Sequence, residues 1–165
     1  MISKLIETAM EQLKFSYTPY SNFKVGASLL TKNGQIYTGC NIENAAYTPT
    51  NCAERTAIFK AVSEGVREFD AICIVGGKAG ILTEYTAPCG VCRQVMMEFC
   101  DPETFRIILA IDKEPMGSSG FVFFRTFMRR KFGSERWFYF FIPVHWFAFS
   151  CYLNISHYEI FYRYS

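Results

Sequence analysis

Two short motifs carry the residue types and spacing that metal-assisted hydrolysis needs. Cys52-Ala53-Glu54 places a carboxylate two residues after a thiol, and Pro88-Cys89-Gly90-Val91-Cys92 places two thiols one helical turn apart. Three thiolates can hold a zinc ion and leave its fourth tetrahedral position open, as a catalytic zinc requires. Glu54 is then placed as a general acid and base. We predict a catalytic zinc ion, one per chain, with Cys52, Cys89 and Cys92 as its ligands.

The same residues allow plainer interpretations. Cys89 and Cys92 alone would also suit a redox pair, or a structural zinc site, although no nearby Cys or His supplies a fourth ligand. Glu54 would also suit a carboxylate that simply caps the positive end of a helix. We expect Arg55 to donate hydrogen bonds to the ligand sulfurs and withdraw their excess negative charge, but a solvated surface cation would fit as well.

Both motifs fall where helices are predicted to start. Residues 52–64 predict a helix with Asn51 as its N-cap and Gly65 as its stop, and residues 90–99 predict a helix that Pro88 opens. Helix N-termini favour a thiolate over a thiol because of their partial positive charge. Two helix starts can therefore present the three sulfurs to one metal ion.

The remaining elements predict an α/β fold. A helical stripe spans residues 2–14, and strands are predicted at residues 24–31, 35–40, 71–76 and 105–110. Asn33-Gly34 predicts a two-residue hairpin turn. The uninterrupted apolar run at 71–76 indicates a strand buried on both faces. The order helix, two strands, helix, strand, helix, strand predicts a layered fold with a mixed sheet flanked by helices.

Composition restricts the class of protein further. A chain of 165 residues with a net charge of +2 is one ordinary domain, and its charge does not favour nucleic acid as a partner. The first twenty residues hold no apolar signal segment, so we expect a cytoplasmic protein. Seven cysteines then favour free thiols and metal ligands over disulfides. We expect Cys40, Cys73, Cys100 and Cys151 to be buried or incidental thiols.

Residues 1–110 resemble cytidine deaminases of the small, three-cysteine, homotetrameric kind. The resemblance runs in order through two-thirds of the chain. It rests on Tyr20-Ser21-Asn22-Phe23-Lys24-Val25-Gly26-Ala27, Gly39-Cys40-Asn41-Ile42-Glu43-Asn44-Ala45, Cys52-Ala53-Glu54-Arg55-Thr56-Ala57 and Pro88-Cys89-Gly90-Val91-Cys92-Arg93-Gln94. It implies a three-layer cytidine-deaminase-like fold.

The resemblance also implies substrate-binding residues. Phe23 would pack against the pyrimidine face, and Tyr47 would line the site. Asn41 and Glu43 would hydrogen-bond the ribose hydroxyls from a loop that includes Ile42. Residue chemistry alone would make Phe23 a core residue and Asn41 and Glu43 ordinary loop residues.

The implied activity is the hydrolytic deamination of cytidine and deoxycytidine to uridine and ammonia, in pyrimidine salvage. Glu54 would move the protons, and zinc would activate the attacking water. The expected partners are a small nucleoside and three further copies of the chain, with no nucleic acid and no membrane. One alternative is a catalytically impaired zinc-binding member that acts in interaction or membrane tethering. Another is a deaminase of a related aminopyrimidine nucleoside, which the Asn41–Glu43 loop disfavours.

The family pattern stops after Ala110, which predicts a core at 1–110 and an atypical aromatic-rich segment at 111–165. That segment holds 18 of the 29 aromatic residues. The family would continue with a strand and a helix that helps to form the tetramer, and neither is recognisable. Three interpretations of this segment stay open. It is a non-native sequence, such as one read in an altered frame, or a folded extension, or it holds a membrane segment at 137–158, where no charged residue occurs.

Overall fold

A mixed β-sheet organises the computed structural model, which describes residues 1–112 and the backbone of residues 121–125. The strand order is β2-β1-β3-β4-β5. β1 runs antiparallel to β2 and β3, β3 and β4 are parallel, and β4 and β5 are antiparallel. The strands span Phe23–Thr31 (β1), Ile36–Cys40 (β2), Phe69–Lys78 (β3), Arg106–Ala110 (β4) and Phe121–Arg125 (β5). The predicted α/β fold with a mixed sheet is confirmed.

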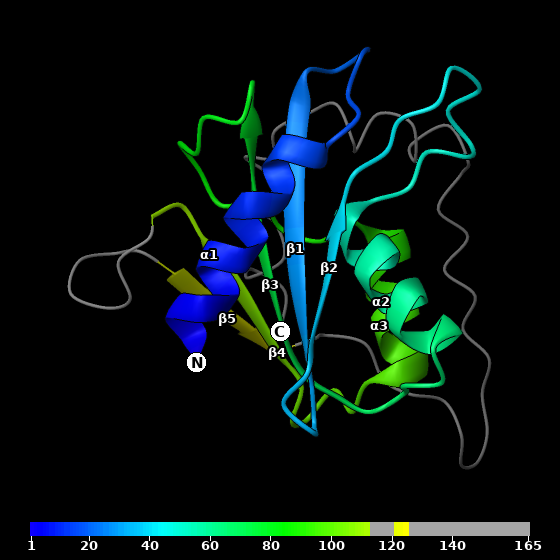
Figure 1. The fold of residues 1–165 in the computed structure, drawn as a ribbon, viewed down its shortest axis with the longest axis vertical. Helices are drawn as coiled ribbons and strands as arrows, with labels where there is room; N and C mark the ends of the chain where they lie inside the picture. The colour runs from blue at the N-terminus through cyan, green and yellow to red at the C-terminus, as the bar shows by residue number, and fades with distance from the viewer. Residues whose placement is uncertain (113–120, 126–165) are drawn as a thin grey trace, which may run out of the picture. The chain divides into compact units, whose positions relative to one another are not determined.

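Helices cover both faces of this sheet (Figure 1). Helix α1 (Ile2–Gln12), which a 3₁₀ turn at Leu13–Phe15 extends, packs its apolar stripe against one face. Helices α2 (Ala53–Ser63) and α3 (Gly90–Phe99) contact each other and cover the opposite face. The result is the three-layer arrangement that the sequence predicts.

The central strand β3 contributes to two separate apolar cores. Ala71, Cys73 and Val75 belong to the cluster under α1, whereas Ile72 and Ile74 belong to the cluster under α2 and α3. All five side chains are buried. Because successive side chains on a strand point to opposite faces, a strand between two helical layers must be apolar throughout. The predicted burial of this strand on both faces is confirmed.

Helix α2 lies unusually close to strand β2, and Gly39 makes this approach possible. A Cβ atom at Gly39 would lie 2.3 Å from the carbonyl oxygen of Ala53 and 2.6 Å from the amide nitrogen of Ala57. Both atoms belong to the backbone of α2, so neither can rotate away. The missing side chain at Gly39 therefore fixes where the first turn of α2 sits on the sheet.

Two local predictions are wrong. The N-cap of α2 is Cys52, not Asn51, and Cys52 makes no side-chain capping bond. The Asn51 side chain instead donates to the Thr56 hydroxyl at 3.1 Å. The β1–β2 turn has three residues, 32–34, rather than two, because the Thr31 amide still donates to the carbonyl oxygen of Gln35 at 2.9 Å. Within this turn Gly34 alone takes a positive φ, of 86°. Elsewhere the predicted elements differ from the observed ones by one or two residues at their ends.

Strand β5 extends the sheet where the sequence predicts no strand. It pairs antiparallel with β4, from Arg106 opposite Arg125 to Ala110 opposite Phe121. The apolar run Phe121–Phe124 is of the same kind as the run at 71–76, but it falls in the aromatic-rich segment, for which three interpretations stay open. Most of the aromatic-rich segment, including Cys151 and the membrane candidate at 137–158, lies outside the described residues. Within the described part, no helix is long and apolar enough to cross a membrane. The division at residue 110 stays a prediction.

Candidate metal and active site

The three predicted ligand sulfurs meet at the N-termini of α2 and α3. Cys52 and Cys89 are the N-cap residues of the two helices, and Cys92 lies in the first turn of α3. The Sγ atoms of Cys52 and Cys89 are 3.8 Å apart, those of Cys89 and Cys92 are 3.5 Å apart, and all three lie within 4.8 Å of one another. Tetrahedral zinc with Zn–S bonds of about 2.3 Å requires sulfur separations of about 3.8 Å. The cluster therefore fits a zinc ion.

The ionisation of the cluster also favours a bound cation. The contacts from Cys52 and Cys92 hold the pKa of Cys89 far below that of a free thiol. The contact with Cys89 raises the pKa of Cys52 to about 12, and the contacts with Cys52 and Cys89 raise the pKa of Cys92 strongly. Three adjacent thiols thus cannot all ionise by themselves, because each negative charge disfavours the next. A divalent metal removes this penalty by binding all three as thiolates.

Arg55 supplies a positive charge beside the sulfurs. Its Nη2 atom donates to the carbonyl oxygen of Thr50 at 2.9 Å and lies 3.5 Å from Cys52 Sγ. Its Nε atom is buried and has no hydrogen-bond partner within the described residues. Three thiolates and Zn²⁺ carry a net charge of −1, so a guanidinium at this position offsets it. The role of Arg55 beside a metal ion stays a prediction.

Glu54 is a buried carboxyl group in the first turn of α2. Only 3% of its surface is exposed, and it is the one carboxylate among the buried residues of the described region. Burial, with a smaller contribution from the neighbouring Cys89 sulfur, raises the pKa of Glu54 to about 7. A carboxyl group with a pKa near neutrality can both accept and donate a proton, which is what general acid–base catalysis needs. The catalytic role of Glu54 stays a prediction.

Asn41 and Glu43, the predicted ribose-binding residues, hold the loop before β1. The Asn41 side chain accepts from Val25 N and donates to Phe23 O, both at 2.8 Å. Glu43 Oε2 accepts from the amide of Tyr20 at 3.0 Å and from that of Ser21 at 3.2 Å. Each side chain keeps unused capacity, since an amide offers four hydrogen-bonding positions and a carboxylate about four.

The other predicted substrate-binding residues occupy different positions around this loop. Phe23 is half-buried at the start of β1. Ile42 exchanges two backbone hydrogen bonds of 2.9 Å with Asn51, which ties its loop to the residue before Cys52. Tyr47 is exposed and has a positive φ of 58°. Its ring centroid lies 6.4 Å from that of Tyr20, with the two ring planes tilted by 45°. Their roles in binding stay predictions.

Two polar residues that support the site were missed from the sequence. The Thr56 hydroxyl contacts the carbonyl oxygens of Cys40 and Cys52, both at 3.1 Å, and so joins β2 to the start of α2. The Ser21 hydroxyl accepts from Phe23 N at 2.9 Å and donates to Glu43 Oε1. The bond from the Phe23 amide to the hydroxyl of Ser21, two residues earlier, is typical of a turn that a serine side chain forms, and the sequence could have suggested it. The bond to Glu43 joins distant segments and leaves no local signal.

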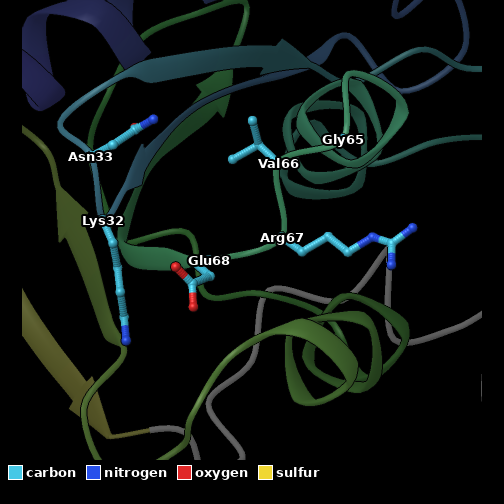
Figure 2. A pocket seen from close by; sticks show the side chains of 6 residues that line it. All are labelled: Lys32, Asn33, Gly65, Val66, Arg67 and Glu68. Carbon is cyan, nitrogen blue, oxygen red and sulfur yellow. The ribbon is translucent and has the colours of Figure 1, made fainter.

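A cavity of about 310 Å³ lies away from the cysteine cluster, at the C-terminal ends of α2 and β1 (Figure 2). Lys32 and Asn33 of the β1–β2 connection face the segment 65–68, which joins α2 to β3. None of the predicted site residues lines this cavity. The candidate site is therefore defined by the cysteine cluster and not by the cavity.

Known proteins resemble this fold and this site. The family described as the cytidine and deoxycytidylate deaminase zinc-binding region matches residues 1–108. A cytidine deaminase of Sporosarcina psychrophila is 54% identical over 100 residues, which cover 61% of this chain and 71% of that protein. One of Halalkalibacterium halodurans is 51% identical over 100 residues, covering 61% and 73%. The crystal structure of a cytidine deaminase from Burkholderia pseudomallei superposes with a TM-score of 0.65 at 42% identity, covering 76% of this chain and 93% of that one.

The fold and the three-sulfur site thus define a zinc-dependent hydrolytic deaminase. The chain belongs to the cytidine and deoxycytidylate deaminase family. The relatives from Sporosarcina psychrophila and Halalkalibacterium halodurans, and the structure from Burkholderia pseudomallei, are cytidine deaminases.

Proposed function

We propose that this chain hydrolyses cytidine, and deoxycytidine, to uridine and ammonia. The observation that carries the proposal is the buried Glu54 carboxyl beside three sulfurs that fit a zinc ion. No structural zinc site needs a neighbouring group that can exchange protons near neutral pH. The family and its named relatives supply the substrate class.

Cys52, Cys89 and Cys92 hold the zinc ion, and Arg55 offsets their charge. When bound, zinc supplies the Lewis acidity that lowers the pKa of a coordinated water and makes it a nucleophile near neutral pH. Glu54 accepts a proton from the attacking water and delivers a proton to N3 of the pyrimidine ring. It then moves the second proton to the departing amino group, so that ammonia leaves and a carbonyl remains at C4.

The loop residues orient the nucleoside. Asn41 and Glu43 use their remaining hydrogen-bonding capacity for the ribose hydroxyls, and Phe23 packs against the pyrimidine. Ile42 and Tyr47 complete the loop around the sugar. The support for these roles is that the Ile42–Asn51 backbone pair brings the loop next to the metal-binding end of α2.

The working assembly is a homotetramer in the cytoplasm that serves pyrimidine salvage. Exposed aromatic side chains support an assembly: Phe15, Tyr17, Tyr20 and Tyr47 are each at least half exposed and belong to the segments around the site. The Tyr20 and Tyr47 rings lie together, with centroids 6.4 Å apart, and exposed apolar side chains that lie together are typical of contacts between protein chains. Light scattering coupled to size-exclusion chromatography tests the proposal, which a monomer at micromolar concentration would contradict.

The activity is tested by measuring uridine formed from cytidine by the purified full-length chain. Glu54→Ala should lower the rate by about 10²- to 10⁴-fold. Glu98→Ala, which changes an exposed glutamate of α3, is the matched control and should keep full activity. Excess cytidine should suppress the turnover of any other aminopyrimidine nucleoside. No uridine from folded, zinc-loaded protein would instead favour the catalytically impaired alternative.

A further inference from the structure

Ser21 lies at the centre of a chain of hydrogen bonds that joins the two parts of the proposed nucleoside site. Its hydroxyl oxygen accepts from the backbone amide of Phe23 at 2.9 Å and donates its proton to Glu43 Oε1. Its own backbone amide donates to Glu43 Oε2 at 3.2 Å. One short side chain therefore contacts both the carboxylate proposed to hold the sugar and the backbone of the residue proposed to hold the base.

Asn41 binds the backbone carbonyl group of Phe23, as Ser21 binds its amide. Asn41 Nδ2 donates to Phe23 O at 2.8 Å, while Asn41 Oδ1 accepts from Val25 N at 2.8 Å. Both polar backbone groups of Phe23 are thus bound by side chains rather than by the neighbouring strand. The ring of Phe23 is consequently placed by the same residues that face the sugar.

Ser21 also restricts the orientation of the Glu43 carboxylate. Oε2 accepts two backbone amides, from Tyr20 and Ser21, whereas the Ser21 hydroxyl is the donor observed at Oε1. A carboxylate has about four acceptor positions, so one stays open for a sugar hydroxyl, in a direction that the other three bonds define. Without the hydroxyl, the Glu43 carboxylate can rotate and the Phe23 amide loses its acceptor.

We infer that Ser21 is a positioning residue that sets Glu43 and Phe23 for the nucleoside and so contributes to recognition of the ribose. The inference rests on the proposed function, and it adds a residue that does not itself touch the substrate. Ser21 acts on binding rather than on proton transfer, because none of these hydrogen bonds reaches Glu54 or the sulfurs.

The test compares Ser21→Ala, Ser21→Thr and Ser63→Ala in the full-length, zinc-loaded chain. Ser63 is an exposed serine at the end of α2 whose hydroxyl donates only to Lys60 O, at 2.8 Å, so Ser63→Ala is the matched control. For cytidine, Ser21→Ala should raise KM about tenfold and change kcat less than about threefold. Ser21→Thr keeps the hydroxyl and should restore KM, and Ser63→Ala should behave as wild type.

A second substrate separates positioning from general loosening of the loop. The preference for cytidine over 2′,3′-dideoxycytidine, expressed as the ratio of kcat/KM values, should fall about fivefold or more in Ser21→Ala, because the dideoxy sugar lacks the 2′- and 3′-hydroxyls that Glu43 would bind. Equal losses for both substrates, an unchanged KM, or failure of Ser21→Thr to restore it would overturn the inference. If the wild-type chain forms no uridine at all, the proposed function itself fails.

Discussion

Replacing Gly39 by alanine should separate helix α2 from strand β2. The new Cβ atom would lie 2.3 Å from the carbonyl oxygen of Ala53, whereas ordinary contact begins at 3.4 Å. The two backbones must therefore move apart by about 1 Å. No side-chain rotation can absorb this shift, because the closest atoms are backbone atoms of Ala53 and Ala57.

The cost of this shift can be estimated for both stability and activity. Overpacking of a rigid contact lowers the free energy of unfolding by about 3 kcal/mol. With a urea dependence of about 2 kcal/mol per molar, the unfolding midpoint should fall by about 1.5 M. Cys52 and Glu54 belong to the first turn of α2, so they move with it. A misplacement of about 1 Å lowers a catalytic rate by about a hundredfold.

Urea unfolding followed by circular dichroism measures the first effect, and uridine formation measures the second. Gly90→Ala is the matched control, since a Cβ atom at Gly90 meets no atom within 4 Å. Alanine at that helical position should leave the stability unchanged or raise it by up to about 1 kcal/mol. A Gly39→Ala variant that unfolds within about 0.5 kcal/mol of wild type would refute the argument that this contact is rigid.

Three further outcomes are expected. Arg55→Gln should lower kcat by about 10- to 100-fold while zinc content, measured by mass spectrometry, stays unchanged; full activity would contradict the role of the guanidinium. Burial raises the pKa of Cys73 and Cys100 to about 12, so both thiols should resist iodoacetamide at about pH 8 in the native protein, as peptide mass mapping would show. Asp70→Ala removes an ion pair with Arg106 whose side chains are 41% and 45% exposed. It should therefore change the free energy of unfolding by less than about 1 kcal/mol in urea titrations.

The metal-binding residues could be predicted because the pattern that reveals them lies within a few consecutive residues. Cys52 and Glu54 are two residues apart, Cys89 and Cys92 are three apart, and each pair starts a helix. The apolar run from Ala71 to Gly76 likewise revealed the central strand directly. In both cases the types of a few neighbouring residues are enough to predict the structure, and the rest of the fold need not be known.

The features that could not be predicted depend on contacts between distant segments. Ser21 meets Glu43 across 22 residues, and Gly39 is required only because α2 crosses β2 at that point. Asn51 has the residue type of an N-cap, yet its side chain binds Thr56 while Cys52 takes the cap position. Tertiary structure decides these cases, since several residue types would satisfy the local pattern equally well.

The most direct test of the account is the zinc content of the purified full-length chain and of two variants, measured by mass spectrometry after gel filtration. Wild type and Glu54→Gln should each carry a single zinc ion per chain, because Glu54 is not a ligand. Cys92→Ser should lose most of its zinc, since it removes one of the three sulfurs. Folded wild-type protein without zinc, or a Cys92→Ser variant that binds zinc as wild type does, would contradict the claim that these sulfurs form the metal site.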